Sequence, residues 1–250
     1  MELWSNSFSD GDPIPGDFAF GLPDEASHVV FGPNLNPHLA WSGVPDGTRS
    51  LAIVVHDRDV PTRPDDVNQE GREVPPDLPR ADFFHWLLVD IPPERTEIEA
   101  GSLADGVVPH GKDAAGTPGG IRQGLNDYTG WFADDPDMSG NYFGYDGPCP
   151  PWNDSIVHHY HFEVFALDVE TLGEACAFAG DLGEGLTVAQ PLLQLGIGPA
   201  RQQLADDRLP HLVVTFGVEV DLVDGAAGGN DVQFHSGQSV CAGWAAGIIK

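Results

Sequence analysis

The 250-residue chain carries 11 Lys and Arg against 39 Asp and Glu, a formal net charge of −28, and 41% of its residues are hydrophobic. This charge makes nucleic acids and anionic membrane surfaces poor partners, because the chain lacks the cations that neutralise phosphates. The longest strongly apolar run, Leu51 to Val55, is far shorter than the roughly 20 residues that a bilayer requires, so we expect no stable membrane insertion.

The acidic residues are scattered along the whole chain instead of forming a tail. At about 1 M salt the repulsion between surface charges is screened beyond about 3 Å, and a high net charge keeps a protein soluble. The cysteines are three, Cys149, Cys176 and Cys241, and their wide spacing argues against a disulfide framework or a structural zinc site. With no signal-peptide pattern at residue 1, this composition predicts a cytoplasmic protein of a salt-in halophile.

Four segments predict strands and therefore a mainly β fold: 50–56, 83–91, 158–168 and 212–220. The first two are short apolar runs with polar or proline residues at their ends, and the last two alternate apolar with polar residues. Helices are predicted after Thr187, a suitable N-cap, and over 199–205. The connections 62–82 and 101–152 are long and rich in Pro, Gly and Asp, which in one compact domain is typical of functional or disordered loops.

Polar residues at the end of the first predicted strand are candidate site residues. Asp57 and Asp59 are two residues apart, so they would point the same way if the strand continued. A polar turn closed by Pro61 is the simpler interpretation. The stretch from Asp135 to Asp146 resembles a calcium loop only weakly, and a solvated acidic loop is the simpler interpretation there as well.

Histidines mark the second and third predicted strands. His85 lies within an apolar strand, where its ring nitrogens need partners, either a carbonyl group or a carboxylate from another strand. Alternation along the third strand places His158 and Tyr160 on one face, with His159 and His161 on the other. Between these strands, the sequence Gly147-Pro148-Cys149-Pro150-Pro151 predicts a stiff turn that could hold a cavity wall in place.

These motifs follow one another in a recognisable order. They are Asn36-Pro37-His38-Leu39-Ala40-Trp41-Ser42-Gly43, Asp57-Arg58-Asp59-Val60-Pro61, His85-Trp86, Gly147-Pro148-Cys149-Pro150-Pro151 and His158-His159-Tyr160. On them the chain resembles the phosphatidylethanolamine-binding protein family, in its bacterial and archaeal Raf kinase inhibitor-like branch, over residues 2 to 222. The resemblance implies a large central antiparallel sheet packed with a smaller sheet, and a few helices on the C-terminal side. It also implies one domain over 1–224, with loop insertions at 62–82 and 131–143 and an extension at 225–250.

The family's members carry a small pocket for phosphate, carboxylate or a phosphorylated headgroup, including that of a phospholipid. By resemblance, the ligand-binding residues of this chain are Asp57, Asp59, His85, Gly147, Pro148, His158 and Tyr160. Two positions depart from the family pattern. Arg58 replaces a proline and is expected to add a cation near the pocket, whereas His159 replaces an arginine and removes a permanent charge.

The resemblance implies a non-catalytic binding or regulatory protein without a cofactor, whose partner is a small anion and which forms a homodimer. In this interpretation a protonated His85 or His158, oriented by Asp57, donates to the anion, and Tyr160 adds its hydroxyl group. Two alternatives remain open for the same cluster. One is a hydrolase-like enzyme that uses Asp, His and Tyr for acid–base catalysis. The other is a divalent-metal site with mixed histidine and carboxylate ligands, to which Asp59 would also contribute.

Overall fold

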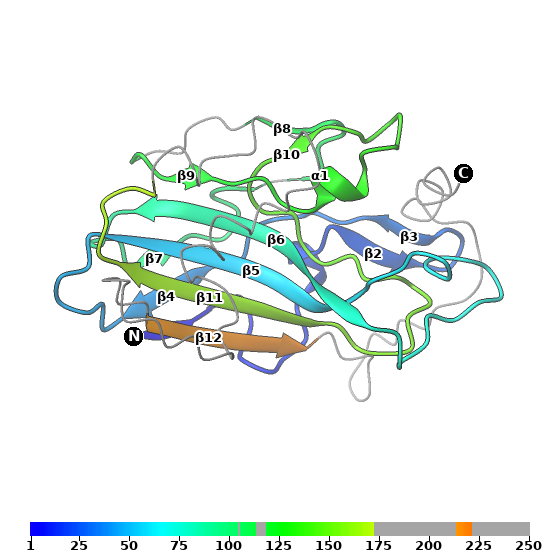
Figure 1. Cartoon of the computed structure of the whole chain (residues 1–250), viewed down its shortest axis with the longest axis horizontal. Helices are drawn as coiled ribbons and strands as arrows, with labels where there is room; N and C mark the ends of the chain where they lie inside the picture. Colours follow the sequence, from blue (N-terminus) through cyan, green and yellow to red (C-terminus); the bar gives the residue numbers. More distant parts are fainter. Residues whose placement is uncertain (105, 114–118, 173–213, 222–250) are drawn as a thin grey trace.

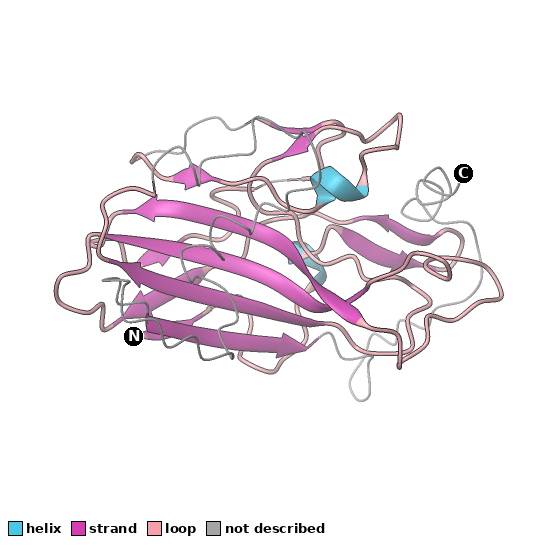
Figure 2. Cartoon of the chain, in the orientation of Figure 1, coloured by secondary structure: helices cyan, strands magenta, loops and turns pink. Residues whose placement is uncertain are grey.

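The computed structural model describes residues 1–104, 106–113, 119–172 and 214–221. In this part of the chain, β-strands form most of the secondary structure (Figure 2). The strands are β1 (Glu2–Trp4), β2 (Gly21–Asp24), β3 (His28–Phe31), β4 (Leu39–Ser42), β5 (Ser50–Pro61), β6 (Arg80–Ile91), β7 (Glu97–Ile98), β8 (Gly111–Lys112), β9 (Arg122–Gln123), β10 (Asn141–Tyr142), β11 (His159–Leu167) and β12 (Val214–Asp221). The helical segments are η1 (Gly16–Phe18) and α1 (Tyr128–Trp131). The mainly β class is therefore confirmed, whereas the helices predicted after Thr187 and over 199–205, like the extension at 225–250, lie outside the described residues.

The central sheet has the strand order β12-β11-β5-β6-β9, and its neighbouring strands all run antiparallel (Figure 1). All four predicted strands lie in it. β5 and β6 are longer than predicted, because β5 continues past His56 to Pro61 and β6 already begins at Arg80. The polar extensions pair with each other after an irregularity between Asp57 and Val60. The polar-turn interpretation of this segment was therefore wrong.

A three-stranded sheet with the order β1-β4-β7 covers one face of the central sheet. Leu39 and Trp41 of β4 belong to the same buried cluster as Ile53 of β5 and Trp86 of β6. From β11 this cluster takes Tyr160, Phe162, Val164 and Ala166, the face that the alternation predicted. The arrangement of a large sheet and a smaller one is thus confirmed.

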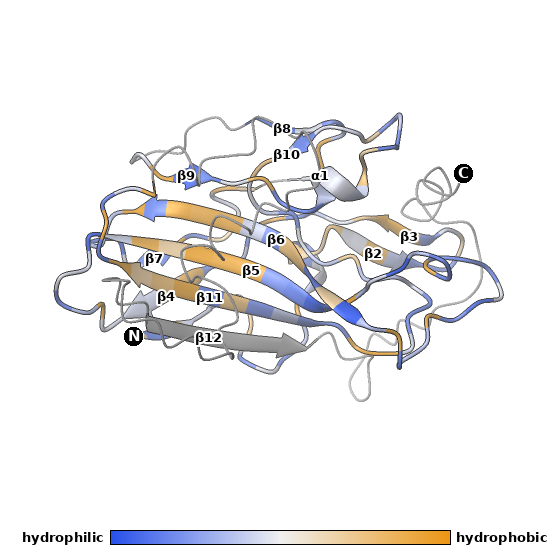
Figure 3. Ribbon diagram, viewed as in Figure 1, coloured by the Kyte–Doolittle hydropathy of each residue, from blue (hydrophilic) through white to orange (hydrophobic). Residues whose placement is uncertain are grey.

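The other face of the central strands is apolar as well. Ala52 and Val54 of β5 pack there against Leu87 of β6 and Phe165 of β11 in a second buried cluster. Strands that are buried on both faces have continuous apolar sequences, which explains why the apolar parts of β5 and β6 do not alternate with polar residues. In Figure 3 the middle parts of β5, β6 and β11 are hydrophobic, and their polar ends gather at one end of the sheet.

The connection 62–79 is fixed against this polar end. The backbone N–H of Asn68 donates to Oδ1 of Asn153 at 2.8 Å, and Oδ1 of Asn68 accepts from the N–H of Trp152 at 3.0 Å. Further along, the N–H of Val74 donates to the backbone oxygen of Asn153 at 3.0 Å. The predicted insertion at 62–82 is therefore an ordered loop joined to the segment after Pro151, and its last three residues are part of β6.

Candidate functional site

A cavity of about 250 Å³ opens where β5, β6 and β11 meet the loop 62–79, helix α1 and the segment 149–151. Its polar lining residues are Asp57, Asn68, His85, Tyr128, His158 and Tyr160. Four of the seven predicted ligand-binding residues are thus brought together around one space. Asp59, Gly147 and Pro148 are not among the residues that line it.

The sheet register explains how residues about a hundred positions apart meet here. Asp57 lies opposite Tyr160 of β11 on one side and opposite Phe83 of β6 on the other. His85 is two residues beyond Phe83 and therefore points to the same face. His158 directly precedes β11, and its ring reaches back to Asp57.

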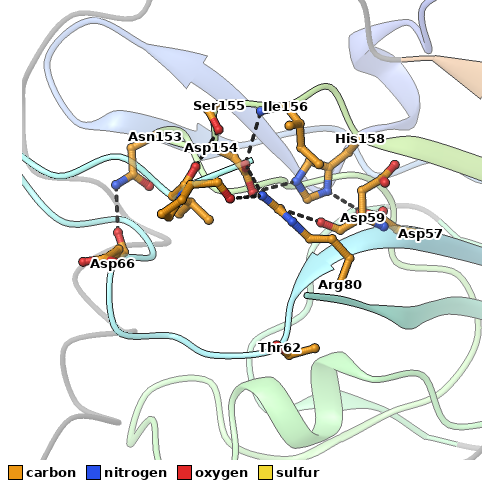
Figure 4. A network of polar contacts seen from close by, with 12 residues as sticks. Asp57, Asp59, Thr62, Asp66, Arg80, Asn153, Asp154, Ser155, Ile156 and His158 are labelled. Carbon is orange, nitrogen blue, oxygen red and sulfur yellow. Dashed lines mark hydrogen bonds and ion pairs between the residues drawn. The ribbon is translucent and has the colours of Figure 1, made fainter. Parts of the chain in front are cut away.

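His158 lies between two carboxylates (Figure 4). Its Nδ1 is 2.6 Å from Oδ2 of Asp57, and its Nε2 is 3.1 Å from Oδ2 of Asp154. Burial alone would lower the pKa of this ring, but the two carboxylates outweigh burial and raise the pKa to about 9. His158 is therefore an imidazolium at neutral pH, and both of its N–H groups are already donated to protein carboxylates.

Arg80 completes this network, and neither it nor Asp154 was predicted from the sequence. The guanidinium group of Arg80 binds both carboxylate oxygens of Asp154, at 2.5 and 3.0 Å, and also donates to the backbone oxygens of Asp59 and Pro75. Its side chain is mostly buried, at 12% exposure. The sequence offered one local signal for this network, the position of Asp154 four residues before His158. It offered none for Arg80, because Arg80 reaches the site only through the pairing of β6 with β5.

One of the two departures from the family pattern, Arg58, does not act as expected. Arg58 lies on the other face of β5 from Asp57, with its Nε 3.9 Å from Asp82, and it does not line the cavity. The expectation of a cation near the pocket at position 58 was therefore wrong, because consecutive strand residues point to opposite faces. His159 binds Asp59, whose Oδ2 accepts from the backbone N–H of His159 and lies 2.6 Å from its Nδ1.

His85 is the neutral histidine of the site. Its Nδ1 donates to the backbone oxygen of Asp146 at 2.7 Å, which confirms the carbonyl alternative. Because a carbonyl oxygen only accepts, the proton is on Nδ1, and the lone pair on Nε2 has no hydrogen-bond partner in the described part of the chain. Burial lowers the pKa of His85 to about 4, so of the two histidines considered as a protonated donor, His85 is neutral near pH 7.

The Asp146 carboxylate, completely buried, organises the segment that holds His85 in place. Its oxygens accept hydrogen bonds from Asn34 at 2.8 Å, Lys112 at 2.9 Å and Asn126 at 2.7 Å. Burial raises the pKa of this carboxyl group, and the Lys112 ammonium and the two amide groups oppose that effect. The weakly predicted calcium loop would need Asp146 as a ligand, and its carboxylate is instead committed to these three side chains.

Gly147 and Pro148 do not line the cavity, and their backbone groups bind other segments of the chain. The N–H of Gly147 donates to Oδ1 of Asn34 at 2.8 Å, and its carbonyl oxygen accepts from the Tyr128 hydroxyl at 2.9 Å. A Cβ atom at position 147 would lie only 2.0 Å from the backbone oxygen of Phe18, so only glycine fits. The oxygen of Pro148 accepts two backbone N–H groups from the start of β2 and the residue before it.

Tyr160 supplies an unused donor. Its side chain is 1% exposed, and its hydroxyl group has no hydrogen-bond partner among the described residues. Burial first, and then the negative charge of Asp57, raise the pKa of Tyr160 well above its ordinary value, so the hydroxyl stays protonated. Although Asp57 is close enough to have this effect, the two groups do not reach hydrogen-bond geometry. A buried donor without a partner is costly, which makes this hydroxyl a natural contact for a ligand.

The alternative of a metal site finds no ligand set in the described residues, where no group of three or more His, Cys, Asp or Glu side chains is arranged around a common point. The physical reason is that the candidate ligands already bind one another: His158 uses both ring nitrogens, and Asp59 binds His159.

The segment from Asp135 to Asp146, which resembles a calcium loop weakly, begins with a buried carboxylate. Asp135 accepts the backbone N–H groups of Asp137 and Met138. The expected solvated acidic loop is thus found only in part, because Asp135 and Asp146 are buried whereas Asp134 and Asp137 are exposed. Within the described residues, no helix has the length and apolar character needed to cross a membrane.

Comparison with known proteins agrees with this architecture. Residues 4–194 match the family model described as phosphatidylethanolamine-binding protein. The UPF0098 protein YbcL of Escherichia coli strain K12 is 34% identical over 174 residues, which cover 69% of this chain and 71% of that protein. A UPF0098 protein of Aquifex aeolicus is 32% identical over 173 residues, again covering 69% of this chain and 71% of the relative.

Among solved structures, the crystal structure of Escherichia coli YbcL, described as a new member of the mammalian family, has a TM-score of 0.55 and 25% identity. The match covers 88% of this chain and 96% of YbcL. The match to the family model extends over most of the chain and includes all four predicted residues that line the cavity. The chain therefore belongs to the phosphatidylethanolamine-binding protein family.

Proposed function

We propose that this protein binds small anions, phosphate or carboxylate groups, in the cavity between β5, β6 and β11, without catalysing a reaction on them. One observation carries the proposal: the hydroxyl of Tyr160 and Nε2 of His85 have no hydrogen-bond partner among the described residues, and both residues line the same space. The two rings are near neighbours, with centroids 5.2 Å apart. One ligand group can therefore satisfy both atoms.

A phosphate monoester has the matching chemistry. Its second pKa is about 6, so near neutral pH it carries both bare oxygens and, in part of the population, a proton. A bare oxygen accepts from Tyr160, while the protonated oxygen donates to Nε2 of His85. A carboxylate takes the same place through the Tyr160 contact.

The charges around the cavity allow an anion to enter a protein of net charge −28. Close to the cavity, the cations His158 and Arg80 offset the carboxylates of Asp57 and Asp154. The long-range repulsion by the remaining surface charge decreases as salt rises. Both N–H groups of His158 are occupied, so the ring stabilises an anion by its charge and has no free nitrogen for proton transfer. This favours binding over acid–base catalysis.

Tyr160→Phe is expected to weaken phosphate binding by about tenfold or more, because hydrogen bonds to charged groups contribute about 1.5–3 kcal/mol. The variant should keep or gain thermal stability, since it removes a buried hydroxyl that has no partner in the described structure. Calorimetric titration of inorganic phosphate in concentrated KCl measures the first effect, and thermal unfolding measures the second.

The matched control is Tyr142→Phe. The hydroxyl of Tyr142 is buried too, but it donates to the backbone oxygen of Met138 at 2.7 Å and lies outside the cavity lining. This variant should lose about 1 kcal/mol of stability and keep its phosphate affinity. Equal phosphate affinity in wild type and Tyr160→Phe, or no phosphate binding by folded wild type, would overturn the proposed function.

The acidic surface supports a cytoplasmic role in a salt-in halophile. The folded protein carries its carboxylates at higher density than the unfolded chain, so their repulsion favours unfolding where salt does not screen it. Dialysis from concentrated KCl into dilute buffer should therefore abolish the far-ultraviolet circular dichroism signal of the sheet. An unchanged spectrum in dilute buffer would exclude adaptation to concentrated salt.

The family resemblance also implies a homodimer. Light scattering in the same KCl buffer tests this by measuring the molar mass of the particle in solution.

A further inference from the structure

Apolar and aromatic side chains form most of the cavity lining. Six of these residues are Val60, Val67, Phe83, Trp131, Phe132 and Pro150. They come from β5, the loop 62–79, β6, α1 with the residue that follows it, and the segment 149–151, so five separate parts of the chain contribute apolar atoms to one space. Ligand pockets of this composition bind an apolar body, while a few polar groups fix its orientation.

The aromatic part of the wall begins directly beside the polar groups. The ring centroid of Phe83 lies 5.0 Å from that of His85 and 5.1 Å from that of Tyr128, which it meets edge to face. The Tyr128 ring in turn stacks on Phe132 at 5.6 Å. The hydroxyl of Tyr128 is committed to the backbone oxygen of Gly147, so the ring is what Tyr128 offers to a ligand.

The size of the cavity also indicates a ligand larger than a single small anion. Its volume is about 250 Å³, whereas one water molecule occupies about 30 Å³ in the liquid. An inorganic phosphate held by Tyr160 and His85 fills only a small part of this space. A water molecule beside the apolar wall has few polar partners with which to form hydrogen bonds. Displacing such water with an apolar group of the ligand therefore increases the binding affinity.

On the basis of the proposed anion binding, we infer that the cavity selects anions that carry a planar apolar group, an aryl phosphate or aryl carboxylate, over the same anions without it. The anionic group accepts from Tyr160, a protonated phosphate oxygen also donates to Nε2 of His85, and the ring packs against Phe83 and Trp131. Aromatic rings at centroid distances of about 4.5–7 Å in edge-to-face or offset geometry stabilise one another beyond the area that they bury. The selectivity therefore comes from Phe83 of β6 and Trp131 of α1, and the anion affinity comes from Tyr160 and His85.

The test is calorimetric titration of four probes into the full chain in concentrated KCl: inorganic phosphate, phosphoethanolamine, phenyl phosphate and benzoate, with acetate as the reference for benzoate. Phenyl phosphate should bind at least about tenfold more tightly than phosphate or phosphoethanolamine, and benzoate should exceed acetate similarly. Trp131→Ala should bring phenyl phosphate down to the affinity of phosphate and leave phosphate binding unchanged. The matched control is Trp4→Ala, because Trp4 is 43% exposed and lies outside the cavity lining.

The outcomes separate this inference from the proposed function. Binding of none of the anions to folded protein overturns both. Phosphate binding with no advantage for phenyl phosphate, or a greater advantage for phosphoethanolamine, overturns the inference and leaves anion binding intact. If circular dichroism shows that Trp131→Ala does not fold, Phe83→Leu replaces it, since this change keeps the apolar volume but removes the ring. Unchanged selectivity in a folded variant at either position also overturns the inference.

Discussion

Asp146→Asn is expected to lower the free energy of unfolding by about 3–5 kcal/mol, the loss typical when one partner of a buried ion pair is removed. The reason lies in the three donors that converge on this completely buried carboxylate, from Asn34, Lys112 and Asn126. An asparagine side chain has one acceptor oxygen and presents its own N–H groups to one of the remaining donors. The Lys112 ammonium, whose side chain is only 17% exposed, then has no counter-charge in this network.

Thermal and denaturant unfolding in concentrated KCl measure this loss, which for a protein of this size corresponds to a decrease of roughly 6–20 °C in Tm. Asp113→Asn is the matched control, because Asp113 follows Lys112 in the chain but is exposed. In the double variant Lys112→Gln/Asp146→Asn the two losses should be less than additive, as the unpaired charge is gone. If Asp146→Asn unfolds at the same temperature as Asp113→Asn, the carboxylate network does not stabilise the fold.

Four of the five strands of the central sheet were predicted from the sequence, whereas β9, only two residues long, was not. For β5 and β6, burial on both faces leaves a clear sequence signal. The apolar runs of β5 and β6 and the alternation of β11 each follow from where their side chains lie. Their polar ends were not predictable from hydrophobic periodicity. The segment from Asp57 to Pro61 is a strand because residues 80–83 of β6 pair with it, and pairing between distant segments leaves no local pattern.

The candidate site was predicted in part for the same reason. The family motifs identified Asp57, His85, His158 and Tyr160, which line one cavity. Periodicity could not reveal that Asp57 and His158 are in contact across about a hundred residues, nor that Arg80 holds Asp154 beside them. The charge states were beyond sequence reasoning because they depend on burial and partners: two histidines of one site have pKa values near 4 and 9.

The stability of the protein is expected to fall as pH rises from about 6.5 to 9. His158 has a folded-state pKa of about 9, raised above the ordinary value of 6.5 by Asp154 and Asp57 against the opposing effect of burial. A raised pKa means that the folded state binds this proton more tightly than the unfolded chain does. The stabilisation is therefore complete below about pH 6.5 and is lost as pH approaches 9, and the difference between the two pKa values corresponds to roughly 3 kcal/mol.

Denaturant unfolding of wild type and His158→Gln at several pH values between 6 and 9.5, in the same KCl concentration, tests this expectation. The variant should have a much shallower slope, whereas His110→Gln, at an exposed histidine, should keep the slope of wild type. Some slope should remain in His158→Gln, because Asp82 and Glu163 also raise the pKa of His56, although burial opposes them. The double variant His56→Gln/His158→Gln should be nearly independent of pH over this range. If His158→Gln alone keeps the full wild-type slope, the imidazolium between Asp57 and Asp154 is not the group whose proton stabilises the fold.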